Sequence, residues 1–422
     1  MAKESTQTGN FSCAGGACRT GAIRTDVRLS RRDFFNLGQR QTGVFPLFNG
    51  DKCVRHGGCG ICAEGCAAHA IHLRNGALRI DRKRCVGCGA CAVACPRGAL
   101  AYPGSTPDEL DQAVTRLLQR ETDSPSRIIA FTCEEKDSDP TLYPANIVPL
   151  RVPCLGLVSP WLILRAFSRG VQGALLLPAR PGCALISRNT SLQNGIRFLQ
   201  ELFAAWSIGP SRIRVSESPD EKLEEFVQTV KGLPVLHLNE FQPGPVPERE
   251  LPLAGMIRTL EKEFGPSAVT CMGEGVAPFG IVRIDPDRCT GCGLCSLNCP
   301  TEALAFSRQS QDNSYRILFR HDRCVGCGVC RKSCPERALG MERILNIRKL
   351  GQPAAPLLED RFSSCRECGA PLLPRALVLR LKARLSAAGA SAWAVDLCPA
   401  CRAKSLSLPG RAAEDRSIEI NL

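Results

Sequence analysis

The sequence is poor in aromatic residues and has no long apolar segment. Aromatic side chains make up 5% of its 422 residues, and no uninterrupted apolar run approaches the roughly 18 residues that a transmembrane helix needs. The best candidate, Leu155–Phe167, is interrupted by Pro160 and Arg165. We therefore expect no membrane-spanning segment. Nucleic-acid binding is also not expected, because no stripe of lysines and arginines is interleaved with aromatics.

Motifs for catalysis and for export are missing as well. No glycine-rich dinucleotide fingerprint, nucleophile–base pair or substrate-pocket motif stands out, so we predict no catalytic residue. Ser30–Phe35 matches a twin-arginine export motif, but the stretch that follows is polar and includes Arg40 and Pro46 instead of an apolar segment. We therefore expect a cytoplasmic protein.

Cysteine, in contrast, is abundant, with 26 residues. Disulfide scaffolds of such density are typical of short secreted domains, whereas this chain is long enough for about two to four domains. Many of the cysteines stand in Cys-x-x-Cys runs, which indicate metal binding in a reducing compartment.

Two segments, residues 49–104 and 280–342, hold two cysteine runs each. In three of these four runs the spacing is Cys-x2-Cys-x2-Cys-x3-Cys-Pro, and Arg84–Gly89 recurs unchanged as Arg323–Gly328. In bacterial ferredoxins with this spacing, three close thiolates hold one [4Fe–4S] cluster and the fourth holds the neighbouring cluster. Both segments resemble such two-cluster ferredoxin domains. The resemblance implies four [4Fe–4S] clusters with these ligand groups: Cys53, Cys59, Cys62 and Cys95; Cys85, Cys88, Cys91 and Cys66; Cys289, Cys292, Cys295 and Cys334; Cys324, Cys327, Cys330 and Cys299.

The first run departs from this pattern in two places. Five residues instead of two separate Cys53 from Cys59, and Ala67 rather than proline follows Cys66. We interpret residues 54–58 as a loop with a three-residue insertion that still allows Cys53 to reach its cluster. Three nearby histidines are expected to be surface residues rather than ligands: His56, His69 and His72.

The C-terminal segment, residues 360–405, carries two further pairs, Cys365 with Cys368 and Cys398 with Cys401. Two such knuckles are typical of a zinc ribbon. Rubredoxin binds a single iron with a similar arrangement, but the aromatic packing expected around that iron is missing here. We favour structural zinc, with a single iron or metal-free thiols as the alternatives.

The formal net charge of +13 counts every cysteine as neutral. Four oxidised [4Fe–4S] clusters with their thiolates would carry about −2 each, and a four-cysteine zinc site about −2 more. The loaded protein would then have a net charge of about +3. We interpret the basic excess as compensation for buried cluster charge.

Residues 126–240 follow a different pattern, in which apolar strand-like runs alternate with runs of helical spacing. This alternation predicts a small α/β domain with a parallel sheet. The expected strands are 127–132, 147–152, 173–177 and 212–215, and the expected helices are 160–168, 193–206 and 220–231. The other predicted parts are an N-terminal extension, 1–48, and a linker, 241–279. The fold class is therefore multidomain α+β and α/β, with two ferredoxin-like domains flanking the parallel-sheet domain and a zinc ribbon at the C-terminus.

Five stretches of this middle region stand in a specific order: Phe131–Cys133, Tyr143–Val158, Ile163–Gly170, Cys183–Asn189 and Pro210–Val215. They resemble the delta subunit of the methyl-viologen-reducing hydrogenase family. The resemblance implies a [2Fe–2S] cluster and electron transfer between a hydrogenase or formate dehydrogenase and a flavin-containing heterodisulfide-reductase-type subunit. Of the ligands that it implies, Cys133, Cys154 and Cys183 are present, but Lys136 stands where a partner cysteine is expected. A cluster would therefore need a fourth ligand from another residue.

These features predict an iron–sulfur electron-transfer subunit of a cytoplasmic oxidoreductase complex. Its expected partners are a flavoprotein or ferredoxin and a hydrogenase, formate dehydrogenase or heterodisulfide-reductase-like enzyme. One alternative is an assembly factor for a molybdenum or nickel enzyme, and another is a reductase with its own active site at an incompletely ligated cluster. Reversible reduction of all clusters favours electron transfer, whereas redox-silent client binding favours assembly. Three cysteines have no assigned role: Cys13, Cys18 and Cys271.

Overall fold

The computed structural model describes residues 45–54, 59–74, 77–120, 127–133, 143–179, 181–216, 223–236, 252–309 and 311–406. The twin-arginine motif, Cys13, Cys18, His56 and Lys136 lie outside these residues. In the part of the chain that is described, no helix combines the length and the apolar character needed to cross a membrane.

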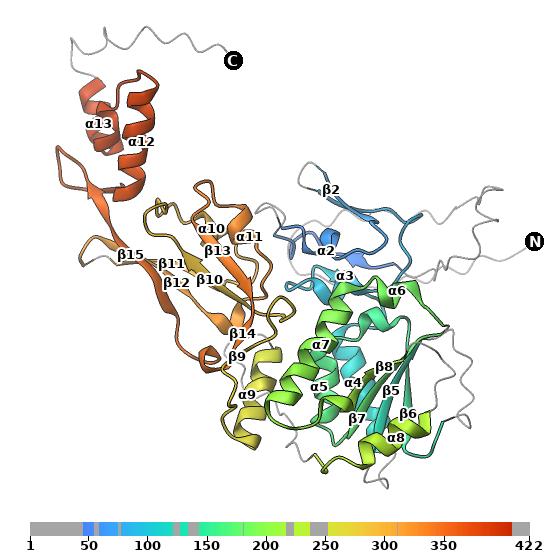
Figure 1. The fold of residues 1–422 in the computed structure, drawn as a ribbon. Coiled ribbons are helices and arrows are strands. Elements are labelled where there is room, and N and C mark those ends of the chain that lie inside the picture. The colour runs from blue at the N-terminus through green and yellow to red at the C-terminus, as the bar shows by residue number, and fades with distance from the viewer. Residues whose placement is uncertain are drawn as a thin grey trace, which may run out of the picture. The chain divides into compact units, whose positions relative to one another are not determined.

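The middle of the chain folds around a four-stranded parallel sheet (Figure 1). The strand order is β6-β5-β7-β8, and each neighbouring pair is parallel. The strands are β5 (Ile128–Cys133), β6 (Ile147–Val152), β7 (Gly173–Leu177) and β8 (Ile213–Val215). All residues of β5 and β7 are buried, as is typical of central parallel strands covered on both faces. The predicted parallel sheet is therefore confirmed.

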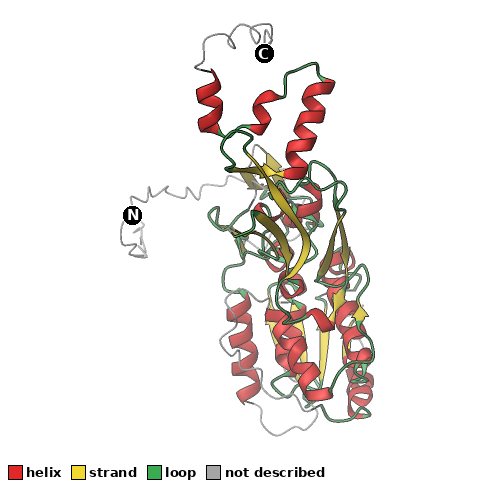
Figure 2. Cartoon of the chain, turned by 90° about the vertical axis from the view of Figure 1, so that its left-hand side faces the viewer, coloured by secondary structure: helices red, strands yellow, loops and turns green. Residues whose placement is uncertain are grey.

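Helices cover both faces of this sheet, as Figures 1 and 2 show. On one face, α8 (Leu223–Lys231) packs against Ile128 and Leu175. On the other face, Ile129 and Phe131 belong to a larger core to which several helices contribute. These helices are α4 (Pro107–Arg120), α5 (Pro160–Phe167), α7 (Thr190–Ala205) and α9 (Pro252–Phe264). Short turns complete the domain: η3 (Leu155–Leu157), α6 (Ala184–Ser187) and η4 (Pro210–Arg212).

Two of these helices lie where no element was predicted. Helix α9 occupies part of the predicted linker, and its Ala254, Ile257 and Leu260 are buried at helical spacing in the larger core. Helix α4 lies between the first ferredoxin-like segment and the predicted α/β domain. Both helices therefore extend the packed domain beyond its predicted boundaries.

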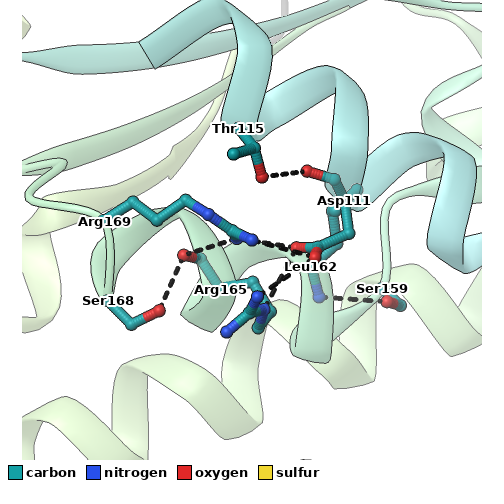
Figure 3. A network of polar contacts seen from close by, with 7 residues as sticks. All are labelled: Asp111, Thr115, Ser159, Leu162, Arg165, Ser168 and Arg169. Carbon is teal, nitrogen blue, oxygen red and sulfur yellow. Dashed lines mark hydrogen bonds and ion pairs between the residues drawn. The ribbon is translucent and has the colours of Figure 1, made fainter. Parts of the chain in front are cut away.

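An ion-pair network joins α4 to α5 (Figure 3). Arg165 donates to the two carboxylate oxygens of Asp111 at 3.1 Å each, and Arg169 donates to the same oxygens at 2.7 and 2.9 Å. The exposed fractions of these side chains are 9% for Arg165, 10% for Arg169 and 17% for Asp111. Burial by itself would raise the pKa of Asp111, but the hydrogen bonds from Arg169 and Arg165 outweigh it and hold this pKa below its ordinary value. The network therefore anchors α4 to the parallel-sheet domain.

The first ferredoxin-like region consists of two small antiparallel strand pairs and two short helices. The pairs are β1 (Leu47–Phe48) with β4 (Leu100–Ala101), and β2 (Ile71–Arg74) with β3 (Ala77–Ile80). The helices are α2 (Ile61–Glu64), which contains Cys62, and α3 (Ala90–Ala94), which contains Cys91. Of the histidines near the first run, His69 is exposed and His72, on β2, is partly exposed.

The second ferredoxin-like region has a similar plan. Strand β10 (Gly280–Ile284) pairs with β13 (Leu339–Arg343), and the short helices α10 (Leu294–Leu297) and α11 (Val329–Lys332) contain Cys295 and Cys330. Between its two cysteine runs, β11 (Leu304–Gln309) and β12 (Ser314–Phe319) form an antiparallel hairpin. This hairpin is extended to a four-stranded antiparallel sheet by β15 (Ala355–Ser364) and β16 (Pro371–Pro374). The remaining short elements are β9 (Cys271–Met272), η5 (His321–Arg323), β14 (Leu345–Asn346) and η6 (Ile347–Lys349).

The C-terminal segment is only partly ribbon-like. Cys365 and Cys368 lie in the turn between β15 and β16, as expected for a zinc knuckle on a hairpin. The second pair, Cys398 and Cys401, instead lies at the start of a helix, and another helix separates the two pairs. The elements are α12 (Arg375–Ala387), η7 (Trp393–Asp396) and α13 (Pro399–Leu406).

The larger core extends past the parallel-sheet domain in both directions along the chain. It includes Tyr102, next to the first ferredoxin-like region, and Phe279, at the start of the second. The ring of Phe279 lies 6.2 Å from the ring of Phe198 on α7. The cysteine-rich regions are therefore packed onto the α/β domain through a common set of apolar side chains.

Candidate metal centres

In the first ferredoxin-like region, the structure brings together two groups of four cysteines. Each group combines three cysteines of one run with the fourth cysteine of the other run, as the ferredoxin spacing predicts. The groups are Cys53, Cys59, Cys62 and Cys95, and Cys66, Cys85, Cys88 and Cys91. Burial, followed by the charges of neighbouring thiols, raises the pKa of Cys62 and of Cys91 to about 12. These thiols would therefore release protons when they bind a metal.

The second region brings its cysteines together in the same crossed way. Cys299 lines a small, mainly apolar cavity together with three cysteines of the following run, Cys324, Cys327 and Cys330. The other group consists of Cys289, Cys292, Cys295 and Cys334. Four thiols converging on a small apolar space are a donor set that fits a [4Fe–4S] cluster.

All four runs share a buried alanine four residues after their last cysteine. These alanines are Ala70, Ala99, Ala303 and Ala338. In three runs the alanine backbone N–H donates to the cysteine Sγ at 3.3 Å: Ala70 to Cys66, Ala99 to Cys95, and Ala338 to Cys334. Such hydrogen bonds stabilise thiolate ligands and tune cluster potentials. The repeated Cys-x3-Ala pattern is visible in the sequence, but its role becomes clear only from these hydrogen bonds.

The ligand loop around Cys88 contacts the parallel-sheet domain at η3. A Cβ placed on Gly156 would lie 2.5 Å from the carbonyl oxygen of Cys88, and a Cβ on Gly89 would lie 2.2 Å from Leu157 Cδ2. Gly89 also has a φ of 74°, in the left-handed region that favours glycine. The two glycines therefore allow the backbones of the two regions to approach closely.

Two cysteines of the parallel-sheet domain are in contact with each other. Cys133 ends β5, and Cys154 follows the neighbouring strand β6. The two thiols are hydrogen-bonded, and their residues are only 4% and 6% exposed. The pKa of Cys154 is raised, first by the hydrogen bond with Cys133 and then by burial, and the charge of Cys88 acts in the same direction. The structure thus places a thiol pair beside Cys88 of the first ferredoxin-like region.

A complete four-thiol site for a [2Fe–2S] cluster is not present among the described residues. Outside the four groups above and the C-terminal quartet, the described cysteines are the contacting pair, Cys183 and Cys271. Cys183 is partly buried just before α6, whereas Cys271 is exposed on β9. These residues therefore do not fit the four-thiol form of the cluster that the resemblance implies, and a [2Fe–2S] centre here would need a ligand of another kind.

The C-terminal quartet has the geometry of a site for a single ion. The Sγ atoms of Cys365, Cys368, Cys398 and Cys401 all lie within 4.8 Å of one another, and those of Cys368 and Cys398 are 3.6 Å apart. Tetrahedral zinc with Zn–S bonds of about 2.3 Å would place its sulfurs about 3.8 Å apart. The four thiols therefore fit zinc.

Hydrogen bonds within this quartet change the pKa values of its thiols. The N–H of Cys398 donates to Sγ of Cys365 at 3.3 Å and lowers the pKa of Cys365 to about 6. Hydrogen bonds with the neighbouring thiols, first that of Cys398, raise the pKa of Cys401 to about 12. At neutral pH the metal-free quartet therefore contains both thiolate and thiol, and cation binding would release the remaining protons.

Known protein families match three parts of the chain. Residues 128–234 match the family of the methyl-viologen-reducing hydrogenase delta subunit. The chain carries a domain of this family, here called the delta domain. Residues 78–101, before the delta domain, match a 4Fe–4S binding domain, and residues 282–341, after it, match a 4Fe–4S dicluster domain. These matches confirm the resemblance to the hydrogenase delta family and to 4Fe–4S ferredoxin domains. In the first ferredoxin-like region the match includes the run from Cys85 to Cys95 but not the run from Cys53 to Cys66.

Relatives are found for the delta domain and for the cysteine runs separately. An iron–sulfur subunit of an F420-non-reducing hydrogenase from Methanocaldococcus jannaschii is 26% identical over 128 residues, which are 28% of this chain and 95% of that protein. An uncharacterised ferredoxin of the same organism is 49% identical over 39 residues, 9% of this chain and 26% of the ferredoxin. Hydrogenase-4 component A of Escherichia coli is 41% identical over 46 residues, 11% of this chain and 22% of that component. The matched segments thus span nearly all of this one hydrogenase subunit and about a quarter of each of the other two proteins.

Proposed function

We propose that this chain is an iron–sulfur electron-transfer subunit of a cytoplasmic oxidoreductase complex. Its four cysteine groups would hold four [4Fe–4S] clusters, which supply one-electron transfer when bound. The end partners would be a hydrogenase, formate dehydrogenase or heterodisulfide-reductase-like enzyme on one side and a flavoprotein or ferredoxin on the other. The C-terminal quartet would hold a structural zinc ion.

The observation that carries this proposal is that neighbouring cysteine groups are close enough to influence one another. Their mutual charges are smaller causes of the raised pKa values than burial and hydrogen bonding, but they indicate proximity, because the interaction between two charges falls off with the distance between them. The interacting pairs are Cys88 with Cys154, Cys62 with Cys91, Cys59 with Cys327, and Cys295 with Cys330. A continuous series of redox centres is what an electron relay requires.

Charged side chains also connect the two ferredoxin-like regions. Lys332 forms an ion pair with Glu64, and Arg97 lies 4.0 Å from Glu302. Exposed ion pairs contribute about 0–1 kcal/mol each to stability. Their value for the proposed function would lie in keeping the Cys59 and Cys327 groups adjacent.

Anaerobic redox titration of the full chain, with electron paramagnetic resonance as the readout, tests this function. After reconstitution with iron and sulfide, all four clusters should be reduced and reoxidised reversibly. Anaerobic co-purification should then recover an oxidoreductase and a flavoprotein or ferredoxin. Binding of an immature metalloenzyme by a chain whose clusters cannot be reduced would refute electron transfer and support the assembly factor.

A further inference from the structure

The contacting thiols of Cys133 and Cys154 can undergo redox chemistry without a metal, by forming a disulfide with each other. Two thiols in hydrogen-bonding contact are the reactants of a disulfide bond, whose formation would shorten their S···S separation to about 2.05 Å. Cys154 lies just beyond β6, at the carboxyl edge of the parallel sheet, where the chain turns into η3. The described residues supply no four-thiol set around the pair.

The surroundings of the pair favour electron exchange with a neighbouring cluster over exchange with solvent. Both cysteines are almost fully buried, so external thiols and oxidants have little access. In contrast, the turn that follows Cys154 touches the backbone of Cys88 through Gly156. This contact connects the pair to the group formed by Cys66, Cys85, Cys88 and Cys91.

We propose that Cys133 and Cys154 form a two-electron dithiol/disulfide couple that exchanges electrons with the [4Fe–4S] cluster of the Cys88 group. On oxidation, two S–H bonds break, one S–S bond forms, and two protons leave to solvent. The two electrons pass one at a time to oxidised [4Fe–4S] clusters of the relay, which are the electron acceptors. Reduction reverses each change. The couple would let the delta domain store an electron pair next to one-electron carriers, and it rests on the proposed electron-transfer function.

The test measures the disulfide directly in the full, anaerobically reconstituted chain. Samples are equilibrated with redox mediators at a series of potentials, quenched in acid, alkylated and digested, and the Cys133–Cys154 peptide is quantified by mass spectrometry. The disulfide-to-dithiol ratio should change tenfold for about 30 mV, the slope of a two-electron couple. Cys154→Ser should abolish the disulfide without changing the cluster content, and the matched control Cys271→Ser, at an exposed cysteine, should leave the disulfide unchanged.

Two results would overturn the couple. The first is that no Cys133–Cys154 disulfide forms anywhere in the potential range in which the [4Fe–4S] clusters titrate. The second is that Cys154→Ser loses about two irons per chain, because the pair would then be ligands of a [2Fe–2S] cluster. Paramagnetic resonance of the same samples separates the two proposals: clusters that fail to bind or reduce contradict the electron-transfer function, whereas reducible clusters without a disulfide contradict only the couple.

Discussion

Replacement of Asp111 by alanine should strongly destabilise the delta domain. The change would leave Arg165 and Arg169 buried at exposed fractions of 9% and 10% without their shared carboxylate. Removing one partner of a buried ion pair costs about 3–5 kcal/mol, because the remaining charge loses its counterion at a position where water does not replace it. We therefore expect the free energy of unfolding to fall by about 3–4 kcal/mol, allowing for the partial exposure of Asp111.

Urea unfolding followed by tryptophan fluorescence measures this loss. Two of the three tryptophans, Trp161 and Trp206, lie in the delta domain, and Trp393→Phe removes the third. Arg197→Ala is the matched control, because Arg197 pairs with Glu201 on α7 of the same domain but is 68% exposed. The control should cost at most about 0.5 kcal/mol.

The same ion pair predicts a pH dependence. The pKa of Asp111 is lowered in the folded protein, so its stabilising effect is fully present above the unfolded-state value of about 3.9 and is lost as the pH falls below it. The difference between the wild type and Asp111→Asn should therefore stay constant from neutral pH to about pH 5 and shrink below about pH 4. A cost for Asp111→Ala no larger than that of Arg197→Ala would refute the role assigned to the network.

Three further predictions concern the metals. The reconstituted chain should contain about 16 irons and one zinc, and eight irons or fewer would contradict four [4Fe–4S] clusters. Cys299→Ser should remove the paramagnetic signal of the cluster bound by Cys324, Cys327 and Cys330, and loss of the signal of the Cys289 cluster instead would contradict the crossed ligands. Cys398→Ser should lose zinc while iron is unchanged. Zinc affinity in the wild type should fall with decreasing pH, because Cys401 must release its proton to bind zinc, and it should fall more steeply below about pH 6, where Cys365 is protonated as well. Competition with a zinc chelator measures both effects.

The sequence predicts best those features that depend on residues close together along the chain. Three cysteines of one run lie within a single loop and helix turn, so their grouping follows from local geometry. Strands β5 and β7 are apolar except for Thr132, as expected for strands buried on both faces, and this composition is visible without knowledge of the fold. The stretches that resemble the hydrogenase delta family lie in and between the strands of the parallel sheet, so this resemblance could also be recognised from the sequence.

What the sequence does not predict depends on contacts between distant segments. Cys133 and Cys154 meet only because β5 and β6 are parallel neighbours, with Cys133 opposite Val152. Helix α9 has an ordinary amphipathic pattern, but nothing in its residues shows that the core it joins belongs to the domain before it. The approach of Gly156 to Cys88 likewise arises from packing between regions, and a glycine alone does not reveal which backbone lies against it.

The core that runs from Tyr102 through Phe198 to Phe279 links metal content to the stability of a domain that holds none of the [4Fe–4S] ligands. Any ligand that binds only the folded state stabilises everything that unfolds with its site. Because the ligand loops and the α/β domain share apolar packing, they should melt together, and iron bound in the loops adds to the unfolding free energy of the delta domain. Loss of iron would thus lower the stability of α7 and the parallel sheet as well as that of the loops that carry the cysteines.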